Sequence, residues 1–363
     1  MNWLYIFLGF SLLILLHEGG HYAAAKATGM RVERFFLFFG PTLWSFRRGE
    51  TEYGIKAVPL GGYVKITGMN PEEEVPPEHE HRAYYRQPVW KRIVVVAAGP
   101  AVNIALAFAI LTFVYFANAQ QVEQKVGEIR TGSPAAKVLQ PGDRILAVDG
   151  KSYPGLDTEA RLQRFGEEVG SHECAGKQVE GCVAASPVAL RIERDGQVQT
   201  ILVKPEYDKA ADRALVGFSY GTEPQDIGLG TAFSRAADSV WLVTHKTASI
   251  FSRIFEEQQR KQISGIVGVS DVANQTIDVG IYPSLLLLAL VSLSLGLINL
   301  LPILPLDGGH IFWALVEKLR GRPASLRVME RATVIGFALV MVLMVIGLTN
   351  DIGRLGSDAY NVR

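Results

Sequence analysis

The sequence has no surplus of charge of either sign, because 36 lysines and arginines balance 36 aspartates and glutamates. A nucleic-acid-binding domain usually carries a basic surplus, so no nucleic-acid partner is expected. Two cysteines in 363 residues are too few for a scaffold held together by disulfides. Charged residues are also scarce, at 20%, whereas apolar residues make up 48%. This composition argues against a wholly soluble, a disordered or a fibrous protein.

Four stretches contain almost no charge, and each is a candidate membrane span. An α-helix needs about 20 mostly apolar residues to cross a hydrocarbon core. A signal peptide is the alternative for residues 1–25, but a basic N-terminal region and a small-x-small cleavage site after Leu16 are both missing. We therefore expect four spans. The uncharged stretches are 2–16, continued to 25 through His17 and Glu18, then 93–117, 279–306 and 332–348.

Lysine and arginine in the connections predict the orientation of these spans. Ten basic residues lie within 28–92 and five within 318–331, whereas none precedes the first span. Basic connections stay on the cytoplasmic side of a membrane. Both termini and the long segment 119–278 are then extracytoplasmic.

Residues 121–206 have the pattern of a small β-rich domain. Residues 132–136 read Gly-Ser-Pro-Ala-Ala, and a turn and a strand follow them within 139–150. The alternating strands 188–193 and 198–203 flank an Asp-Gly turn, which predicts a hairpin. The stretch resembles a PDZ domain of the kind associated with bacterial proteases. The resemblance implies peptide binding by strand addition; the alternative is a domain that only restricts access.

Two further features belong to the segment outside the membrane. Cys174 and Cys182 lie in an insertion of small and polar residues, where a disulfide is favoured over two free thiols or a metal pair. Residues 229–258 carry apolar side chains at helical spacing. This spacing predicts a helix that lies on the outer membrane surface, with an ordinary domain helix as the alternative.

The chemistry is expected at His17-Glu18-Gly19-Gly20-His21 in the first span. Residues four apart share one helix face, so His17 and His21 can bind one metal ion while Glu18 stands beside it. Neutral imidazole suits zinc, which polarises a carbonyl and acidifies water. Three ionisable groups inside a span are costly and indicate a functional site, with a structural polar cluster as the alternative.

A catalytic zinc ion needs a third protein ligand and an open position. Asp307 is the acidic residue at the inner end of the third span, and that end lies at the level of His17 and His21 because spans one and three run in the same direction. Pro302 and Pro305 are expected to break the helix there and turn the carboxylate inward. A cap of the next helix is the alternative role, and His310 is left out of the ligand set.

The motifs together resemble the site-2 protease family, in particular its bacterial RseP-type branch of zinc intramembrane metalloproteases. They are the His-Glu-x-x-His sequence, Asn299-x-x-Pro302 with Leu306-Asp307-Gly308, Gly99-Pro100-x-x-Asn103, and 53–68, which looks like that family's membrane-associated β-hairpin. The resemblance implies one Zn²⁺ per chain bound by His17, His21 and Asp307, with water activated by Glu18. It also implies that Asn299 and the hairpin, with Gly61 and Gly62, hold the substrate. This chain departs from better-known relatives in having room for one PDZ domain rather than two, and in the spacing of its prolines before Asp307.

The expected fold is an α-helical polytopic membrane protein with four transmembrane helices, an inserted β-rich extracytoplasmic PDZ-like domain and a membrane-associated β-hairpin. The expected segments are a first span 1–27, a cytoplasmic loop with the hairpin 28–92, a second span 93–118, the PDZ-like domain 121–206, an amphipathic helical segment 207–278, a third span 279–307, a cytoplasmic loop 308–331, a fourth span 332–350 and an extracytoplasmic tail 351–363.

The expected function is zinc-dependent cleavage of single-pass transmembrane segments that another protease has already trimmed outside the inner membrane. Anti-sigma factors and signal-peptide remnants are the expected classes of substrate, and the bilayer is the expected surrounding. A catalytically silent scaffold and a metal or proton transporter are the alternatives from other classes. Transporters commonly show internal repeats of their spans, and no such repeat is visible here. A soluble-type zinc protease with membrane anchors would need the histidine motif outside the hydrocarbon.

Overall fold

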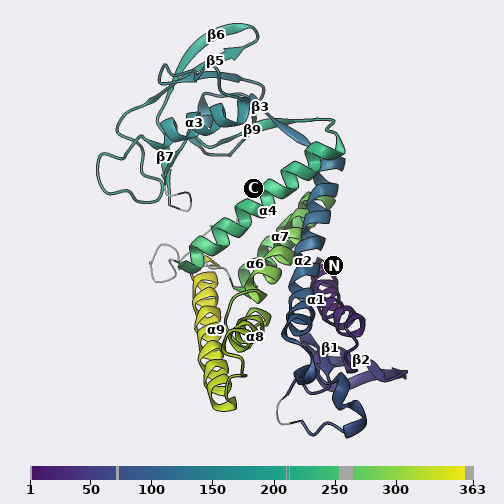
Figure 1. Cartoon of the computed structure of the whole chain (residues 1–363). Coiled ribbons are helices and arrows are strands. Elements are labelled where there is room, and N and C mark those ends of the chain that lie inside the picture. Colours follow the sequence, from purple (N-terminus) through teal and green to yellow (C-terminus); the bar gives the residue numbers. More distant parts are fainter. Residues whose placement is uncertain (1, 71–72, 210, 212, 253–264, 356–363) are drawn as a thin grey trace. The chain divides into compact units, whose positions relative to one another are not determined.

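The computed structural model describes residues 2–70, 73–209, 211, 213–252 and 265–355 (Figure 1). They form two compact units. Of the described residues, one unit contains those up to Phe116 and those from Gly228 to Leu355, and the other is Ala117–Ile227. We call the first the helical unit and the second the β-rich unit, and each is described by itself.

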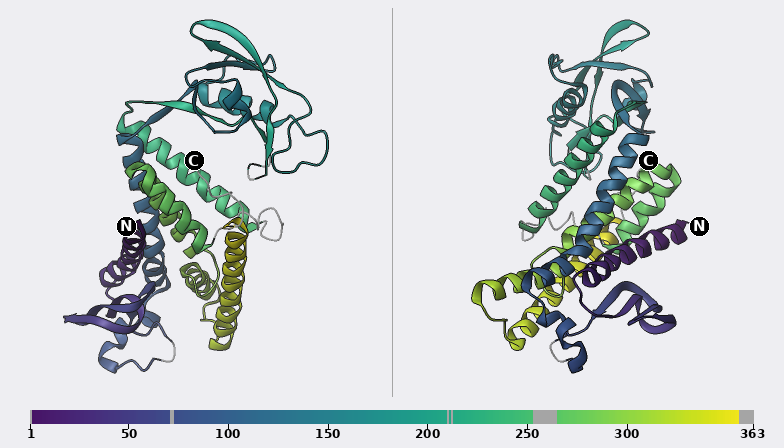
Figure 2. Two further views of the ribbon diagram at one scale, coloured as in Figure 1. Left: turned by 180° about the vertical axis from the view of Figure 1, so that it is seen from behind. Right: turned by 45° about the vertical axis from the view of Figure 1, so that its right-hand side comes forward.

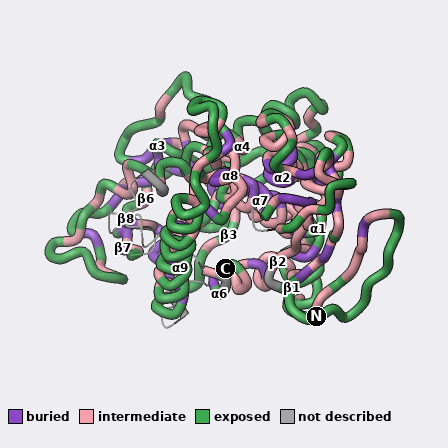
Figure 3. Tube along the Cα trace, turned by 60° about the horizontal axis from the view of Figure 1, so that its bottom comes forward, coloured by how far each residue is buried: buried purple, intermediate pink, exposed green. Residues whose placement is uncertain are grey.

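Within the part of the chain that the structure describes, four helices of the helical unit are long and apolar enough to cross a membrane, as the uncharged stretches predict. They are α1 (Asn2–Ala27), α2 (Val89–Ala117), α7 (Ile281–Asn299) and α9 (Leu326–Leu355). Helix α1 continues without a break through the two histidines, so the motif lies within the first of these candidate spans. Large apolar side chains remain exposed on these helices, as Ile335 does with 70% of its surface, and α9 is exposed along most of its length (Figure 3). Lipid, rather than water, suits such a surface.

The third span is shorter than its uncharged stretch. Helix α7 ends at Asn299, residues 300–306 are not helical, and α8 (Asp307–Arg320) begins at the aspartate. The end follows from Pro302 and Pro305, because proline lacks the N–H that a helix interior needs. At the other end of the chain, α9 begins before 332, and 351–355 of the expected tail continue it. Residues 356–363 lie outside the described part.

The β-hairpin expected over 53–68 is only half of the observed sheet. Strand β2 (Thr51–Ile66) pairs with β1 (Val32–Arg48), and the first half of β1 lies between the two halves of β2, with Leu37 opposite both Gly62 and Ile55. Positive φ angles at Gly40 and Gly61 mark the bends. The expectation missed both halves of β1. The first half pairs with 62–66, about 30 positions away, which no local turn signal reveals, whereas the second half pairs with 51–56 across a short turn after Arg48. Both views of Figure 2 show this sheet beside α1.

The β-rich unit extends beyond the expected end at residue 206. Its main sheet has the order β6-β5-β4-β3-β9, and the last strand pairs with the first. The pairing of β3 with β9 cannot be predicted from a local pattern. Apolar residues of the sheet and of α3 form one core, which includes Ile145, Phe165 and Leu190. The strands are β3 (Gln120–Ile129), β4 (Arg144–Val148), β5 (Val188–Arg194), β6 (Gln197–Val203), β7 (Glu206–Asp208), β8 (Arg213–Leu215) and β9 (Phe218–Pro224), and α3 is Thr158–Gly170.

Two other expectations about the middle of the chain can be compared with the structure. Cys174 and Cys182 form a disulfide, as favoured from the sequence, and their Cα atoms are 6.2 Å apart. The helix expected over 229–258 is α4 (Leu229–Ser252), and residues 253–258 of it lie outside the described part. Helix α6 (Ile266–Val279) then leads to α7. The short helices η1 (Pro77–Arg82) and η2 (Tyr84–Arg86) precede α2.

Candidate metal centre

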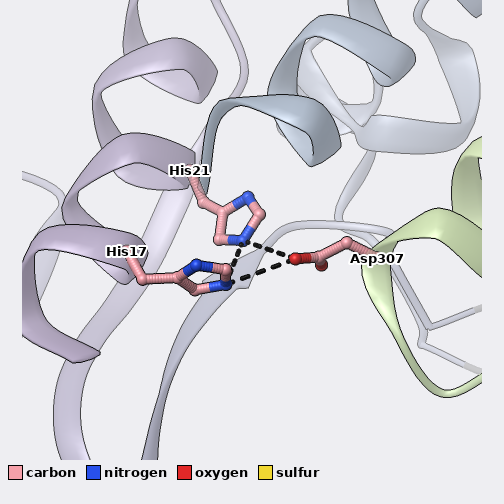
Figure 4. A group of neighbouring side chains, drawn as sticks. All are labelled: His17, His21 and Asp307. Carbon is pink, nitrogen blue, oxygen red and sulfur yellow. Dashed lines mark hydrogen bonds and ion pairs between the residues drawn. The ribbon is translucent and has the colours of Figure 1, made fainter. Parts of the chain in front are cut away.

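Two helices bring three predicted ligands together. His17 and His21 lie one turn apart on the same face of α1, and Asp307 is the first residue of α8 (Figure 4). Asp307 Oδ2 lies 3.2 Å from His17 Nε2 and 3.3 Å from His21 Nε2, and the two nitrogens are 3.3 Å apart. Side chains 290 positions apart in the sequence thus offer three donor atoms to one point.

The spacing of these donor atoms fits zinc. Zinc binds imidazole nitrogen and carboxylate oxygen at about 2.0–2.1 Å in tetrahedral geometry, which requires about 3.3 Å between neighbouring donors. Asp307 Oδ2 is also buried without a hydrogen-bond partner of good geometry among the described residues, although both imidazoles are near. A buried carboxylate oxygen without a donor is costly. A cation bound between the three groups removes that cost.

The ring of His21 is oriented from α2. Its Nδ1 donates a hydrogen bond of 2.9 Å to the backbone carbonyl of Val95. This bond selects the tautomer whose Nε2 has a free lone pair, as metal-binding histidines require. Sequence analysis did not identify Val95, because the role belongs to its backbone and leaves no mark in the residue type.

Glycines allow α1 and α2 to approach closely at this level. A Cβ atom on Gly20 would lie 2.6 Å from the Ala98 carbonyl oxygen, and one on Gly99 would overlap the His21 imidazole. By contrast, a Cβ on Gly19 would have no neighbour within 4 Å. Of the two central glycines in the motif, only Gly20 is therefore required for packing.

All the residues expected at the site line one cavity of about 550 Å³. Glu18 projects toward the sheet, since a Cβ on Gly62 would lie 2.8 Å from its Cγ. Asn299 is the last residue of α7. His310, which was left out of the ligand set, lies in the cavity wall and outside the cluster of ligand atoms. The lining includes His17, Glu18, His21, Phe39, Gly61, Gly62, Tyr63, Val64, Val95, Asn299, Asp307 and His310.

Comparison with known proteins agrees with this chemistry. A model of peptidase family M50 matches residues 5–343. The chain is 33% identical to zinc metalloprotease Rip1 of Mycobacterium tuberculosis, with 86% of this chain and 85% of the relative covered. It is 30% identical to the regulator of sigma-E protease RseP of Escherichia coli, with 94% of this chain and 96% of the relative covered. A protein of Rhizobium meliloti is 32% identical over 95% of this chain and 94% of the relative.

Proposed function

The chain belongs to peptidase family M50, the site-2 protease family, and is a zinc metalloprotease of the membrane; from this premise we propose that it cleaves single-pass membrane proteins within their transmembrane segments. The observation that carries the proposal is the convergence of three ligand atoms within 4.8 Å of one another, beside Glu18, in a cavity of the helical unit. A protease that acts on soluble substrates has no need to place such a group inside a span.

In this proposal, His17, His21 and Asp307 hold one zinc ion. When bound, zinc supplies Lewis acidity to the scissile carbonyl and to the attacking water. The Glu18 carboxylate takes the proton from that water and returns it to the leaving amine. His21 keeps its orientation throughout, because its other nitrogen stays bonded to the Val95 carbonyl.

The substrate is proposed to be held by backbone hydrogen bonds. A transmembrane helix hides its carbonyls in its own hydrogen bonds, so it must unwind before water can attack. Residues 62–66 of β2 pair with β1 on one side, and within the described part no strand covers their other side. This edge lies at the cavity with Gly61 and Gly62, where an unwound segment can add as a strand. The Asn299 amide is proposed to hold a further backbone group.

The proposed setting follows from charge and from surface. The basic residues of 28–92 and 318–331 favour a cytoplasmic location for these connections and, with them, for the active site. Exposed apolar side chains of β1, Leu43 and Trp44 among them, suit a sheet that touches the bilayer. The β-rich unit is then extracytoplasmic and PDZ-like, and it either binds a peptide or admits only substrates trimmed by a first protease. In a bacterial inner membrane, anti-sigma factors and signal-peptide remnants are the substrates of that description.

The first prediction separates the roles of Glu18 and Asp307. Glu18→Gln is expected to keep the zinc and to lower cleavage by about 10²–10⁴-fold, because it removes the general base. Asp307→Ala is expected to lose zinc affinity as well, because it removes a ligand. Zinc content and cleavage of a model transmembrane helix are measured on full-length protein in detergent.

An exposed glutamate provides the control for this pair. Glu74→Gln makes the same chemical change outside the cavity and is expected to behave as wild type. A wild-type protein that binds no zinc would contradict the proposal, and so would a Glu18→Gln variant that cleaves at the wild-type rate.

A further inference from the structure

An ion pair joins α2 to α8 outside the candidate ligand set. The Arg92 guanidinium donates hydrogen bonds of 2.9 and 2.5 Å to the two carboxylate oxygens of Glu317. Both side chains are largely buried, with 11% and 22% of their surfaces exposed. Glu317 lies on the same helix as Asp307, about three turns further along. The mechanism above assigns no role to either residue.

The guanidinium of Arg92 is held on all sides. Its Nε donates to the Gln87 carbonyl at 3.1 Å, and its Cζ atom lies 5.8 Å from the centre of the Tyr84 ring. Both remaining nitrogens bond Glu317. A bidentate pair of this kind fixes the orientation of its partner as well as its distance. Arg92 therefore forms a rigid contact with α8 through Glu317.

Helix α8 has few other attachments. Among its described side chains, only those of Asp307 and Glu317 make polar contacts with another element. At its first turn, Gly308 and Gly309 pack against the backbone of residues 300–304. That packing holds the first turn of the helix, and Ala314 is buried in its middle. The contact between Glu317 and Arg92 supplies the second point, and two points define the direction of a rigid rod.

The same stretch of α2 also orients one of the other ligands, His21. Val95, one turn after Arg92, accepts the hydrogen bond from His21 Nδ1, and Gly99 makes room for the His21 ring. Both ligand-bearing helices, α1 and α8, are thus held by contacts with residues 92–99 of α2. The separation of Asp307 from the two histidines is a consequence of these two attachments.

We propose that Arg92 and Glu317 are positioning residues that hold Asp307 against His17 and His21, and that they thereby set the affinity and the coordination geometry of the metal. The inference rests on the proposed function in one respect, that the three ligands bind zinc. It adds that a contact about three turns from the ligand controls the site. Residues that support a ligand from outside typically change metal affinity by about 10–100-fold when they are replaced.

The test compares Glu317→Gln and Arg92→Lys with wild type in full-length, detergent-solubilised protein. Each keeps the approximate size of the side chain and removes the charge-assisted bidentate contact. Zinc affinity is measured by competition with a chelator. The visible spectrum of the Co²⁺-loaded protein reports the coordination geometry, because four-coordinate Co²⁺ absorbs far more strongly than six-coordinate Co²⁺.

Arg82→Lys is the matched control. Arg82 also forms a bidentate pair, at 2.7 and 2.9 Å with Glu50, in the same unit. This pair is more exposed than that of Arg92, with 32% and 28% of the two side chains exposed, and Arg82 contacts neither α8 nor residues 92–99. The reversed pair, Arg92→Glu with Glu317→Arg, tests whether the contact itself matters.

Both pair variants are expected to lose zinc affinity by about 10–100-fold and to shift the Co²⁺ spectrum toward that of Asp307→Ala, while Arg82→Lys leaves both unchanged. Partial recovery in the reversed pair supports the same conclusion. A Glu317→Gln variant with wild-type zinc affinity and a wild-type Co²⁺ spectrum would overturn this inference but not the proposed function. An equal loss of zinc affinity in Arg82→Lys would do the same. A wild-type protein without zinc affinity would overturn the proposed function itself.

Discussion

At the scale of single residues, the absence of side chains matters as much as their presence. His21 can lie between α1 and α2 only because position 99 carries no Cβ. The helices themselves would favour alanine over glycine by about 1 kcal/mol at each such position. The glycines at 20 and 99 therefore oppose helix propensity in favour of close packing beside the ligands.

Replacement of these glycines gives a prediction at this scale. Gly99→Ala is expected to displace the His21 ring, to weaken zinc binding and to abolish most cleavage. Gly19→Ala makes the same change in the neighbouring helix, where nothing lies within 4 Å, and is expected to bind zinc as wild type does. Zinc affinity by chelator competition measures both. Equal behaviour of the two variants would show that the close approach at residue 99 has no consequence for the metal.

At the scale of elements, a buried ion pair stabilises the β-rich unit. Asp143, with 2% of its surface exposed, accepts hydrogen bonds of 2.7 and 2.6 Å from Arg194, which ends β5, and one from the Gln140 N–H. Burial alone raises the pKa of Asp143, but the bonds from Arg194 and Gln140 outweigh it and hold the pKa below its usual value. The turn before β4 is thereby tied to β5.

The stability of this unit is expected to depend on pH. Because the pKa of Asp143 is lower in the folded than in the unfolded state, its contribution is complete above the unfolded value of about 3.9 and is lost as the pH falls through the folded value. Asp143→Asn is expected to cost about 1–3 kcal/mol at neutral pH, since it leaves Arg194, with 24% of its side chain exposed, without its charge partner. It is also expected to flatten the acid dependence.

Hydrogen exchange of the backbone amides in 120–224, followed in the full-length protein, measures both effects. Asp195→Asn, in the exposed turn after β5, is the control for a lost carboxylate. Unchanged acid dependence in Asp143→Asn would mean that another group controls it.

At the scale of the whole molecule, the arrangement of charge relative to the spans predicts the orientation in the membrane. The native cysteines are both in the disulfide, and no free cysteine is found in the chain. A single introduced cysteine can therefore be labelled selectively. Glu74 and Asp195 are exposed positions in the predicted cytoplasmic loop and in the β-rich unit, respectively.

In intact cells whose outer membrane has been made permeable, a thiol reagent that cannot cross the inner membrane is expected to label Asp195→Cys and to spare Glu74→Cys. Opening of the inner membrane is expected to make both react. Labelling of Glu74→Cys in intact cells would reverse the proposed orientation and place the active site nearer the outside.

Several features were determined by the sequence itself, because they depend on neighbouring residues. Uncharged runs of sufficient length predict four spans, and the described residues contain four helices of that kind. The spacing of His17 and His21 places them on one helix face whatever surrounds the helix. The prolines after Asn299 predict the end of α7, because they lack the N–H that a helix interior needs.

Other features were decided only by tertiary structure, because they join residues distant in the chain. The sequence supplied Asp307 as a candidate through the order of the spans, but only packing brings its oxygen to 3.2 Å from His17. The insertion of β1 between the halves of β2, the closing pair of β3 and β9, and the bonds from His21 to Val95 and from Arg92 to Glu317 had no local signal. The local spacing of residues determines which side chains share one face of a helix or strand. Long-range packing determines which other element that face contacts.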